Sequence, residues 1–257
     1  MKVGGGIDAM SGPHWIVPDW PAPSGIRAGV STRGIAGVSL PPWNTFNLGD
    51  RCGDDPDHVA ANRAALFEKC GLPQAPHWLR QAHGNEVVRV SSQSAHDVPE
   101  ADAAVTSDPG VVLAILTADC LPVFFSSEDG AHIGAAHAGW RGMAASVLEA
   151  TVAAMGISPD QIVAWLGPAI GASSYEVGSE VRDAFVADDH RTKAAFTETR
   201  PGHWLCDLYA LATQRLRICG VREIHGGDFD TRIDGRFYSY RRDPNTGRFA
   251  SLIWRAS

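Results

Sequence analysis

The stretch Val-Val-Leu-Ala-Ile-Leu-Thr-Ala-Asp-Cys at residues 111–120 contains an unbroken apolar run that leads directly into an acid and a thiol. The run at 111–116 has the length and the branched side chains of a strand that is buried on both faces. A second apolar run, Ile133–Ala136, leads in the same way into His137. These patterns predict sheets covered by helices, with Cys120 and His137 placed where strands end and loops begin.

The rest of the chain extends this α/β pattern. Segments that end at Gly or Pro predict helices at 58–70, 143–155 and 207–219, and we expect a shorter helix at 179–187. Apolar runs predict further strands at 26–30, 87–90, 103–106, 123–125, 162–166 and 252–254. Because strands and helices mix without strict alternation, we expect mixed β-sheets with helices in a layered single domain. That domain would cover residues 13–257, after a flexible, glycine-containing tail at 1–12.

The composition excludes several classes of protein. Hydrophobic residues make up 44% of the 257, which is enough for a globular core. The formal net charge of −7 and the lack of a basic run argue against nucleic acid or an anionic membrane as a partner. No stretch approaches the roughly 20 apolar residues of a membrane span. Five scattered cysteines do not form a disulfide framework, and the tail lacks the apolar region of a signal peptide, so we expect a cytoplasmic protein.

Two imidazoles and one thiol stand in three short motifs, namely Gln-Ala-His-Gly (81–84), Ala-Asp-Cys-Leu-Pro (118–122) and Ala-Ala-His-Ala-Gly-Trp-Arg-Gly (135–142). Together His83, Cys120 and His137 would make a tripod that suits zinc and leaves one coordination position open, as catalytic zinc sites do. The long gaps between them exclude a zinc finger, whose ligands come in close pairs. From the residues alone, the competing interpretation is a buried free cysteine flanked by two polar loop histidines.

Other residues have the chemistry that a substrate site needs. Asp119 is either a catalytic carboxylate that moves a proton or orients a nucleophile, or a turn residue bonded to backbone. Arg141 precedes the helix predicted from Met143, where an anion would meet free amides, unless this segment is only a tight connection. The remaining candidates, each with a structural alternative, are Arg33, Arg241 and Arg242 for phosphate, Asn47 for a sugar hydroxyl or base edge, and Tyr175 for stacking on a ring.

At these motifs the chain resembles the multicopper polyphenol oxidase (laccase-domain) family, whose members are also described as purine nucleoside phosphorylases. The resemblance runs from about Val30 to Trp254. Besides the three motifs above, it is carried in order by residues 31–33, 37–39, 47–49, 167–171, 175–178, 239–243 and 246–248. The chain departs from the family at Asp230, which stands before Thr231 where the family often has a cysteine.

The resemblance implies a layered α/β fold, similar to that of cysteine-hydrolase-like proteins, and metal binding by His83, Cys120 and His137. It also implies Zn²⁺ as the cofactor and purine nucleosides and phosphate as the partners. The implied reactions are phosphorolysis of adenosine, inosine, guanosine and methylthioadenosine, with adenosine deamination as a further activity. We expect a monomer or a weak homo-oligomer.

Two other functions remain open at this point. A copper-dependent oxidase of phenols would use Cu²⁺, because two histidines and one cysteine also make a blue-copper site. One tripod, however, is not the histidine-rich set of several coppers that the reduction of oxygen needs. A metal-free thiol hydrolase would use Cys120 as nucleophile and His137 or His83 as its base.

Overall fold

The chain passes from one β-sheet to another at residues 118–120. This crossover is seen in the computed structural model, which describes residues 14–94 and 97–256. The strand before it, β5 (Val112–Thr117), belongs to a four-stranded sheet in the order β1-β2-β13-β5. The strand after it, β6 (Leu121–Ser127), lies inside a six-stranded sheet in the order β12-β8-β6-β7-β4-β3. Asp119 and Cys120 therefore sit on the connection between the two sheets.

The other elements of the described chain have the following bounds. The first sheet also contains β1 (Trp15–Ile16), β2 (Ile26–Ser31) and β13 (Phe249–Arg255), and the second contains β3 (Val87–Arg89), β4 (Ala103–Thr106), β7 (Ile133–Ala138), β8 (Ile162–Leu166) and β12 (Glu223–Gly226). A small third sheet, in the order β10-β11-β9, comprises β9 (Glu176–Gly178), β10 (Phe196–Arg200) and β11 (His203–Cys206). The helices are α1 (Pro56–Cys70), α2 (Trp140–Ala144), α3 (Val147–Met155), α4 (Ser179–Val186) and α5 (Leu208–Ile218), with 3-10 turns at Pro159–Gln161 and His190–Ala195.

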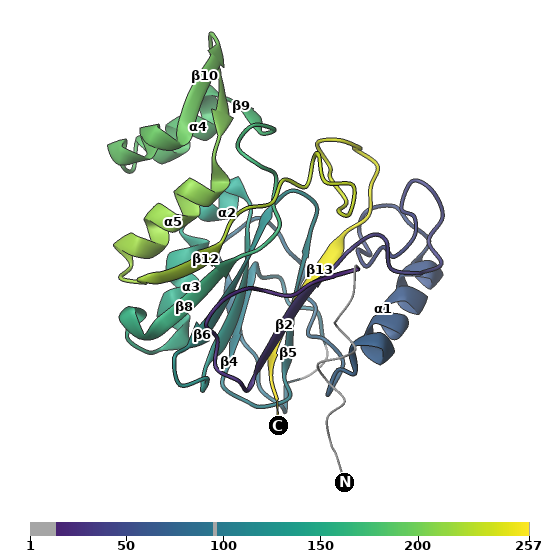
Figure 1. The fold of residues 1–257 in the computed structure, drawn as a ribbon. Coiled ribbons are helices and arrows are strands. Elements are labelled where there is room, and N and C mark those ends of the chain that lie inside the picture. Colours follow the sequence, from purple (N-terminus) through teal and green to yellow (C-terminus); the bar gives the residue numbers. More distant parts are fainter. Residues whose placement is uncertain (1–13, 95–96, 257) are drawn as a thin grey trace.

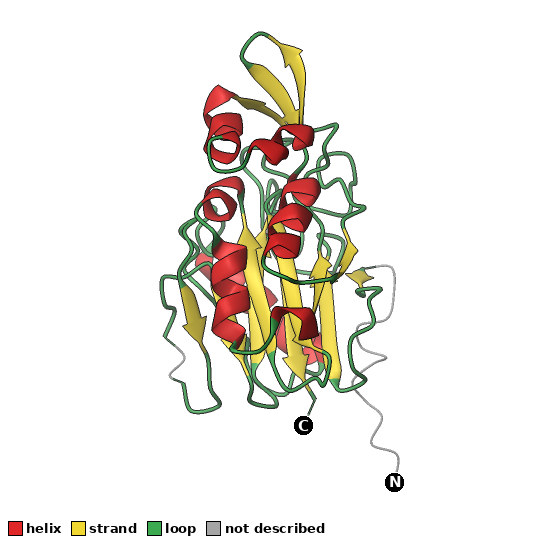
Figure 2. Cartoon of the chain, turned by 90° about the vertical axis from the view of Figure 1, so that its left-hand side faces the viewer, coloured by secondary structure: helices red, strands yellow, loops and turns green. Residues whose placement is uncertain are grey.

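The two large sheets pack face to face; α1 covers the outer face of the four-stranded sheet, and several helices cover that of the six-stranded sheet (Figures 1 and 2). Leu113 and Ile115 of β5 pack between the sheets with Phe124 of β6. The alternate residues of β5, Val112 and Ala114, belong to the core beneath α1. Because successive side chains of a strand point to opposite faces, a strand buried on both faces needs an apolar residue at every position. This explains the unbroken run at 111–116.

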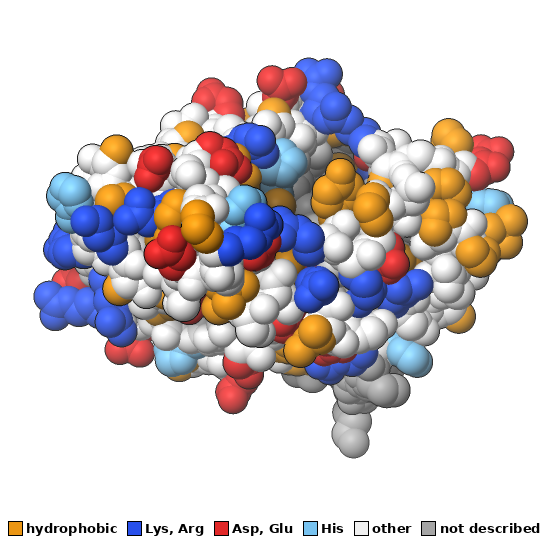
Figure 3. Space-filling model, turned by 90° about the horizontal axis from the view of Figure 1, so that it is seen from above, with side chains coloured by type: hydrophobic (Ala, Val, Ile, Leu, Met, Phe, Trp, Pro, Cys, Tyr) orange, Lys and Arg blue, Asp and Glu red, His pale blue; other side chains and the backbone are white. Residues whose placement is uncertain are grey.

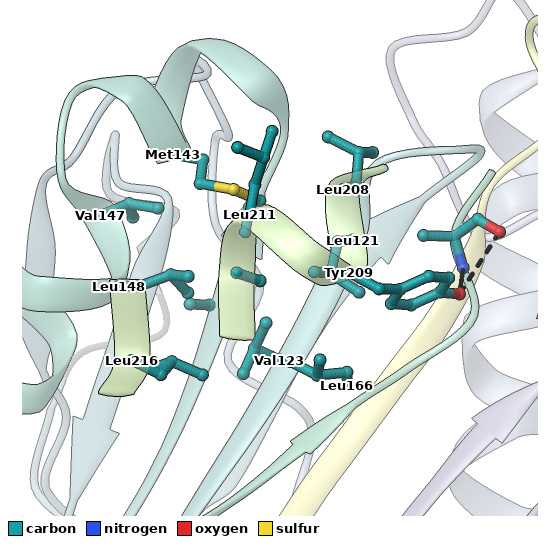
Figure 4. Close-up of a cluster of buried hydrophobic side chains, with 14 of the residues drawn as sticks. Leu121, Val123, Met143, Val147, Leu148, Leu166, Leu208, Tyr209, Leu211 and Leu216 are labelled. Carbon is teal, nitrogen blue, oxygen red and sulfur yellow. Dashed lines mark hydrogen bonds between the residues drawn. The ribbon is translucent and has the colours of Figure 1, made fainter. Parts of the chain in front are cut away.

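The outer face of the six-stranded sheet is covered by α3 and α5. Leu121 and Val123 of β6 pack there with Leu148 of α3 and Leu211 of α5 (Figure 4). Each of these leucines is fully buried, and each such side chain stabilises the fold by about 1.5–3 kcal/mol through removal from water. This layer holds β6, and with it the crossover at Cys120, in place.

Tyr209 of α5 fixes the connection that follows β8. Its hydroxyl accepts a hydrogen bond from the N–H of Ala169 at 2.8 Å (Figure 4). It also donates one to the carbonyl of Gly167 at 3.1 Å. The next residue, Ile170, donates its N–H to the carbonyl of Asp119 at 2.9 Å. Residues 169–170 thus connect α5 to Asp119 in the crossover between the sheets.

The predicted layered α/β fold with mixed sheets is confirmed, since the six-stranded sheet contains both parallel and antiparallel pairs. Each predicted strand occurs, but two details were wrong. The strand predicted to end at Ala136 continues to Ala138, so His137 lies inside β7 and not beyond its end. The helix predicted at 143–155 begins at Trp140 and is broken at Ser146, whose φ of 72° lies in the left-handed region and separates α2 from α3.

Several elements had no counterpart in the sequence prediction. The small third sheet projects with α4 from one end of the molecule (Figure 1). Its strand β10 is exposed at four of five residues and therefore lacks the apolar signal that revealed the core strands. The expected tail at 1–12 lies outside the described residues, and the likeness to cysteine hydrolases stays a prediction. No described helix has the length and the apolar character needed to cross a membrane.

Candidate metal centre

His83, Cys120 and His137 meet at the end of the sheets where β5 stops and β6 starts. Their ligand atoms all lie within 4.8 Å of one another. The Nε2 atom of His83 lies 3.8 Å from the Sγ atom of Cys120, and the two imidazole rings meet edge to face with centroids 4.8 Å apart. His137 is buried, Cys120 half-buried and His83 exposed, so the cluster is open on the His83 side.

Strand pairing brings two of the three residues together. In the antiparallel pair of β6 and β7, Leu121 faces Ala138 and Pro122 faces His137. Cys120, which directly precedes Leu121, is therefore held beside the residues that follow His137. The third residue, His83, comes from the loop before β3 and has a φ of 61°.

Gly139 leaves the space in which the three side chains converge. A Cβ atom at this position would lie 3.0 Å from Sγ of Cys120, 3.0 Å from Cδ2 of His83 and 3.7 Å from Nε2 of His137. Its φ of −65° is available to any residue. A glycine at 139 is thus favoured by the lack of space and not by backbone conformation, because any side chain there would press on Cys120 and His83.

Asp102 is the functional residue that sequence reasoning missed. It is fully buried, and its Oδ1 atom lies 2.7 Å from Nδ1 of His137. Its carboxylate also accepts hydrogen bonds from the backbone N–H groups of three consecutive residues: Ala82 (3.1 Å), His83 (3.0 Å) and Gly84 (2.7 Å). Because an ionised carboxylate only accepts, Nδ1 of His137 carries its hydrogen and Nε2 faces the thiol. One carboxylate therefore orients both histidines.

The electrostatics of the cluster favour a thiolate. Burial alone would raise the pKa of Cys120, but the charge and hydrogen bonds of His137 and His83 outweigh it and lower that pKa to about 6. Burial alone would lower the pKa of His137, whereas the Cys120 thiolate and the Asp102 carboxylate raise it to about 9. At neutral pH the pair is a thiolate beside an imidazolium until a metal displaces the imidazolium proton.

The donor set fits a divalent metal ion. Zn–N bonds of about 2.0–2.1 Å and Zn–S bonds of about 2.3 Å place tetrahedral ligands about 3.3–3.6 Å from one another. The 3.8 Å between His83 Nε2 and Cys120 Sγ is close to this range, and the three donors, which all lie within 4.8 Å of one another, would move closer together around a bound ion. Two imidazoles and a thiolate suit zinc or copper, and the fourth position would face the open side.

Residues 27–256 match the family model described as multi-copper polyphenol oxidoreductase laccase. The chain belongs to this family. It is 51% identical over 240 residues to "Purine nucleoside phosphorylase YfiH" of Escherichia coli strain K12, which covers 93% of this chain and 98% of that protein. It is 53% identical over 253 residues to "Purine nucleoside phosphorylase" of Xylella fastidiosa strain 9a5c, covering 94% and 97%.

Solved structures agree with this family assignment. The crystal structure of Neisseria meningitidis protein NMB0706 matches with a TM-score of 0.91 at 42% identity and covers 95% of this chain and 100% of that chain. The crystal structure of YlmD from Geobacillus stearothermophilus matches with a TM-score of 0.87 at 29% identity, covering 96% and 98%. The chain therefore shares its layered fold with these two proteins.

Two of the predicted substrate residues of this laccase-family chain, Arg241 and Tyr175, contact each other. The guanidinium of Arg241 lies 4.9 Å from the centre of the Tyr175 ring and donates to the carbonyl of Glu176 at 2.7 Å. Burial raises the pKa of the Tyr175 phenol, the charge of Cys120 raises it further, and the charges of Arg241 and Arg141 lower it. Tyr175 is therefore within electrostatic range of the thiol and of both guanidinium groups. The end of the sheets seen in Figure 3 is hollowed, with Lys and Arg side chains on the rim.

Asn47 and Arg242 have contacts that favour their structural alternatives. Asn47 is fully buried, and its amide donates to the carbonyl of Gly49 and to Asp54 and accepts from the N–H groups of Gly49 and Arg248. The guanidinium of Arg242 donates to the backbone carbonyls of Thr231, Arg232 and Phe237. Arg33 stacks 5.2 Å from the ring centre of Tyr238. These residues brace the loops around the site.

Asp230, which departs from the family pattern, is held by its neighbours. Its carboxylate accepts a hydrogen bond from the N–H of Arg232 at 3.1 Å and another from the Ser174 hydroxyl at 2.6 Å. A Cβ atom at Gly171 would lie 2.7 Å from Cγ of Asp230. The carboxylate thus joins two loops, and it is not among the three clustered residues that could hold a metal ion.

We predict that Gly139→Ala folds normally but binds zinc at least about tenfold more weakly, because the added methyl would force Cys120 and His83 apart. Zinc affinity measured by chelator competition, together with thermal unfolding, tests this. Gly25→Ala is the matched control, because a Cβ atom there meets nothing within 4 Å. Equal zinc affinity in the two variants would contradict the proposed arrangement.

We predict that Asp102→Asn weakens zinc binding about 10- to 100-fold, because the amide nitrogen would face a donor instead of accepting a hydrogen bond. The free energy of unfolding should fall by about 1–3 kcal/mol for the same reason. Denaturant titration and chelator competition measure the two effects. Asp183→Asn, at a side chain that is 66% exposed, makes the same chemical change as a control. An unchanged zinc affinity in Asp102→Asn would show that this carboxylate does not orient the ligands.

We predict that zinc binding at pH 7.5 releases about one proton per chain, and that this proton comes from His137. Cys120, with its pKa lowered to about 6, is already a thiolate at that pH, whereas His137, with its pKa raised to about 9, is protonated. Below pH 6 the thiol must also lose a proton, so the affinity should fall more steeply. Calorimetry in buffers of different ionisation enthalpy measures the release. A value near two at pH 7.5 would contradict the lowered pKa of Cys120.

Proposed function

We propose that the chain is a zinc-dependent purine nucleoside phosphorylase. The observation that carries the proposal is the open His83, Cys120 and His137 cluster, which lies within electrostatic range of Tyr175 and the guanidinium group stacked on it. The names of the Escherichia coli and Xylella fastidiosa relatives support the nucleoside and phosphate substrates. The proposed substrates are adenosine, inosine, guanosine and methylthioadenosine, with adenosine deamination as a second activity, and the proposed location is the cytoplasm.

The residues of the site suit the two halves of phosphorolysis. Phosphate attacks the sugar carbon while the bond to the purine breaks, so the site must bind an anion next to a flat ring. Arg241 and Arg141 supply positive charge for the phosphate, and the Tyr175 ring offers a surface for stacking. Asp102 keeps the hydrogen of His137 on Nδ1, which leaves Nε2 and Cys120 free to hold a metal. A bound zinc ion would supply a Lewis acid at the open position.

A thiol hydrolase is the second candidate, because Cys120, His137 and Asp102 form a thiol, imidazole and carboxylate series. This series accounts for a nucleophile, a base and an orienting group without any metal. It gives no role to His83, whose Nε2 also faces the sulfur. Copper oxidation of phenols is favoured only by the family description. Within the described residues a single cluster of possible metal ligands occurs, which argues for one ion rather than several.

Protein produced without added copper should contain stoichiometric zinc and convert a purine nucleoside and phosphate into free base and ribose 1-phosphate in equal amounts. We predict that Cys120→Ala loses both the zinc and the turnover, because it removes the only anionic ligand. Metal analysis and chromatography of the products measure these outcomes. Cys219→Ala, at a half-buried thiol outside the cluster, is the control. Full activity after complete removal of metal by a chelator would refute the proposal, and hydrolysis of a thiol-reactive ester by that metal-free protein would favour the hydrolase.

A further inference from the structure

Asp119 connects the segment that carries Cys120 to parts of the chain that are far away in the sequence. Its Oδ1 atom accepts a hydrogen bond from the Thr231 hydroxyl at 2.6 Å, and its Oδ2 atom accepts one from the backbone N–H of Arg241 at 2.6 Å. Its own carbonyl accepts the N–H of Ile170 at 2.9 Å. Asp119 is buried and has a φ of 88°, a conformation that Asp and Asn adopt more readily than most residues. Two connections, the one that follows β8 and the one between β12 and β13, are therefore anchored on the residue beside Cys120.

Arg241 is held at both ends. Asp119 fixes its backbone, while its guanidinium donates to the carbonyl of Glu176 and lies over the ring of Tyr175. The side chain is exposed, so these contacts restrict a cation that would otherwise be free to move in solvent. An arginine held in one orientation binds an oxyanion better, because less side-chain entropy is lost on binding.

We propose that Asp119 is a positioning residue, which holds the Arg241 guanidinium over Tyr175 to receive the phosphate substrate. This inference rests on the proposed phosphorylase function and gives Asp119 a role different from proton transfer. Each oxygen of its carboxylate already accepts a short hydrogen bond, and neither donor is an acid or base near neutral pH. The carboxylate points to the loops at 231 and 241, whereas the neighbouring Cys120 faces the two histidines.

Two substitutions at 119 separate positioning from proton transfer. In Asp119→Asn the amide oxygen can still accept from the N–H of Arg241, and the amide nitrogen can donate to the Thr231 hydroxyl, which rotates to accept. In Asp119→Gly both hydrogen bonds are lost, while glycine adopts the φ of 88° without strain. A positioning role survives the first change and not the second, whereas a proton-transfer role is lost in both.

The experiment measures initial rates of the zinc-loaded protein while phosphate and nucleoside are varied separately. We expect Asp119→Gly and Arg241→Ala each to raise the KM for phosphate about tenfold or more, with unchanged zinc content and a KM for nucleoside within about threefold of wild type. Asp119→Asn should restore the KM for phosphate to within about threefold of wild type. The double variant Asp119→Gly/Arg241→Ala should be no worse than Arg241→Ala alone, because both changes remove one interaction.

Arg200→Ala is the control for loss of a neighbouring cation, because Arg200 pairs with the Glu176 side chain at 2.9 Å. It should leave the KM for phosphate unchanged. Equal losses of kcat in Asp119→Asn and Asp119→Gly, with the KM for phosphate unchanged, would overturn the proposal in favour of proton transfer. Losses that multiply in the double variant would also overturn it.

Binding of inorganic phosphate alone, measured by calorimetry on the same variants, separates this inference from the phosphorylase proposal. Wild-type protein that binds phosphate but turns over no nucleoside would refute the phosphorylase function, and the order of phosphate affinities would then decide the role of Asp119. Wild-type protein that binds no phosphate would refute the inference itself.

Discussion

The buried carboxylate of Asp102 is the interaction on which the site depends. A buried charge costs several kcal/mol unless it is fully paired, and Asp102 meets this requirement with three backbone N–H groups and the imidazole of His137. Since the N–H donors belong to the segment that carries His83, the same charge fixes the positions of both imidazoles. Because an unpaired Asp102 carboxylate would destabilise the fold, these hydrogen bonds keep both histidines in position without a bound ligand.

The crossover between the two sheets provides the second constraint. The chain leaves the four-stranded sheet and enters the six-stranded one within residues 118–120. As a result, the side chains of the neighbouring residues Asp119 and Cys120 point in different directions. Cys120 faces His83, while the carboxylate of Asp119 reaches the loops at 231 and 241. A φ of 88° at Asp119 accompanies this change of direction. The site and the loops around it are thereby connected through one peptide bond.

Burial explains how much of this architecture the sequence could predict. Strands enclosed on both faces, such as β5 and β6, are apolar throughout and stand out from the chain, whereas the exposed strand β10 does not. Asp102 was missed because its partner His137 is 35 residues away, and a sequence shows an acid in an apolar run without showing what it binds. Asn47 and Arg242 were predicted to bind substrate because they lie in family motifs, but their hydrogen bonds hold loops together. A motif match alone does not separate residues that fold a site from residues that touch a substrate.

His83 is the residue that distinguishes a metal site from a thiol catalyst at this centre. Cys120, His137 and Asp102 alone would satisfy the requirements of a nucleophile, a base and an orienting acid. The fold nevertheless holds the His83 loop by hydrogen bonds to the same carboxylate and keeps Gly139 free of a side chain that would push His83 from the sulfur. His83 is exposed, has a left-handed backbone conformation and turns its Nε2 atom to the sulfur of Cys120. A thiol catalyst that already has His137 as its base does not need this second imidazole. It completes a three-donor cluster, and that is the physical reason to favour a metal at this site.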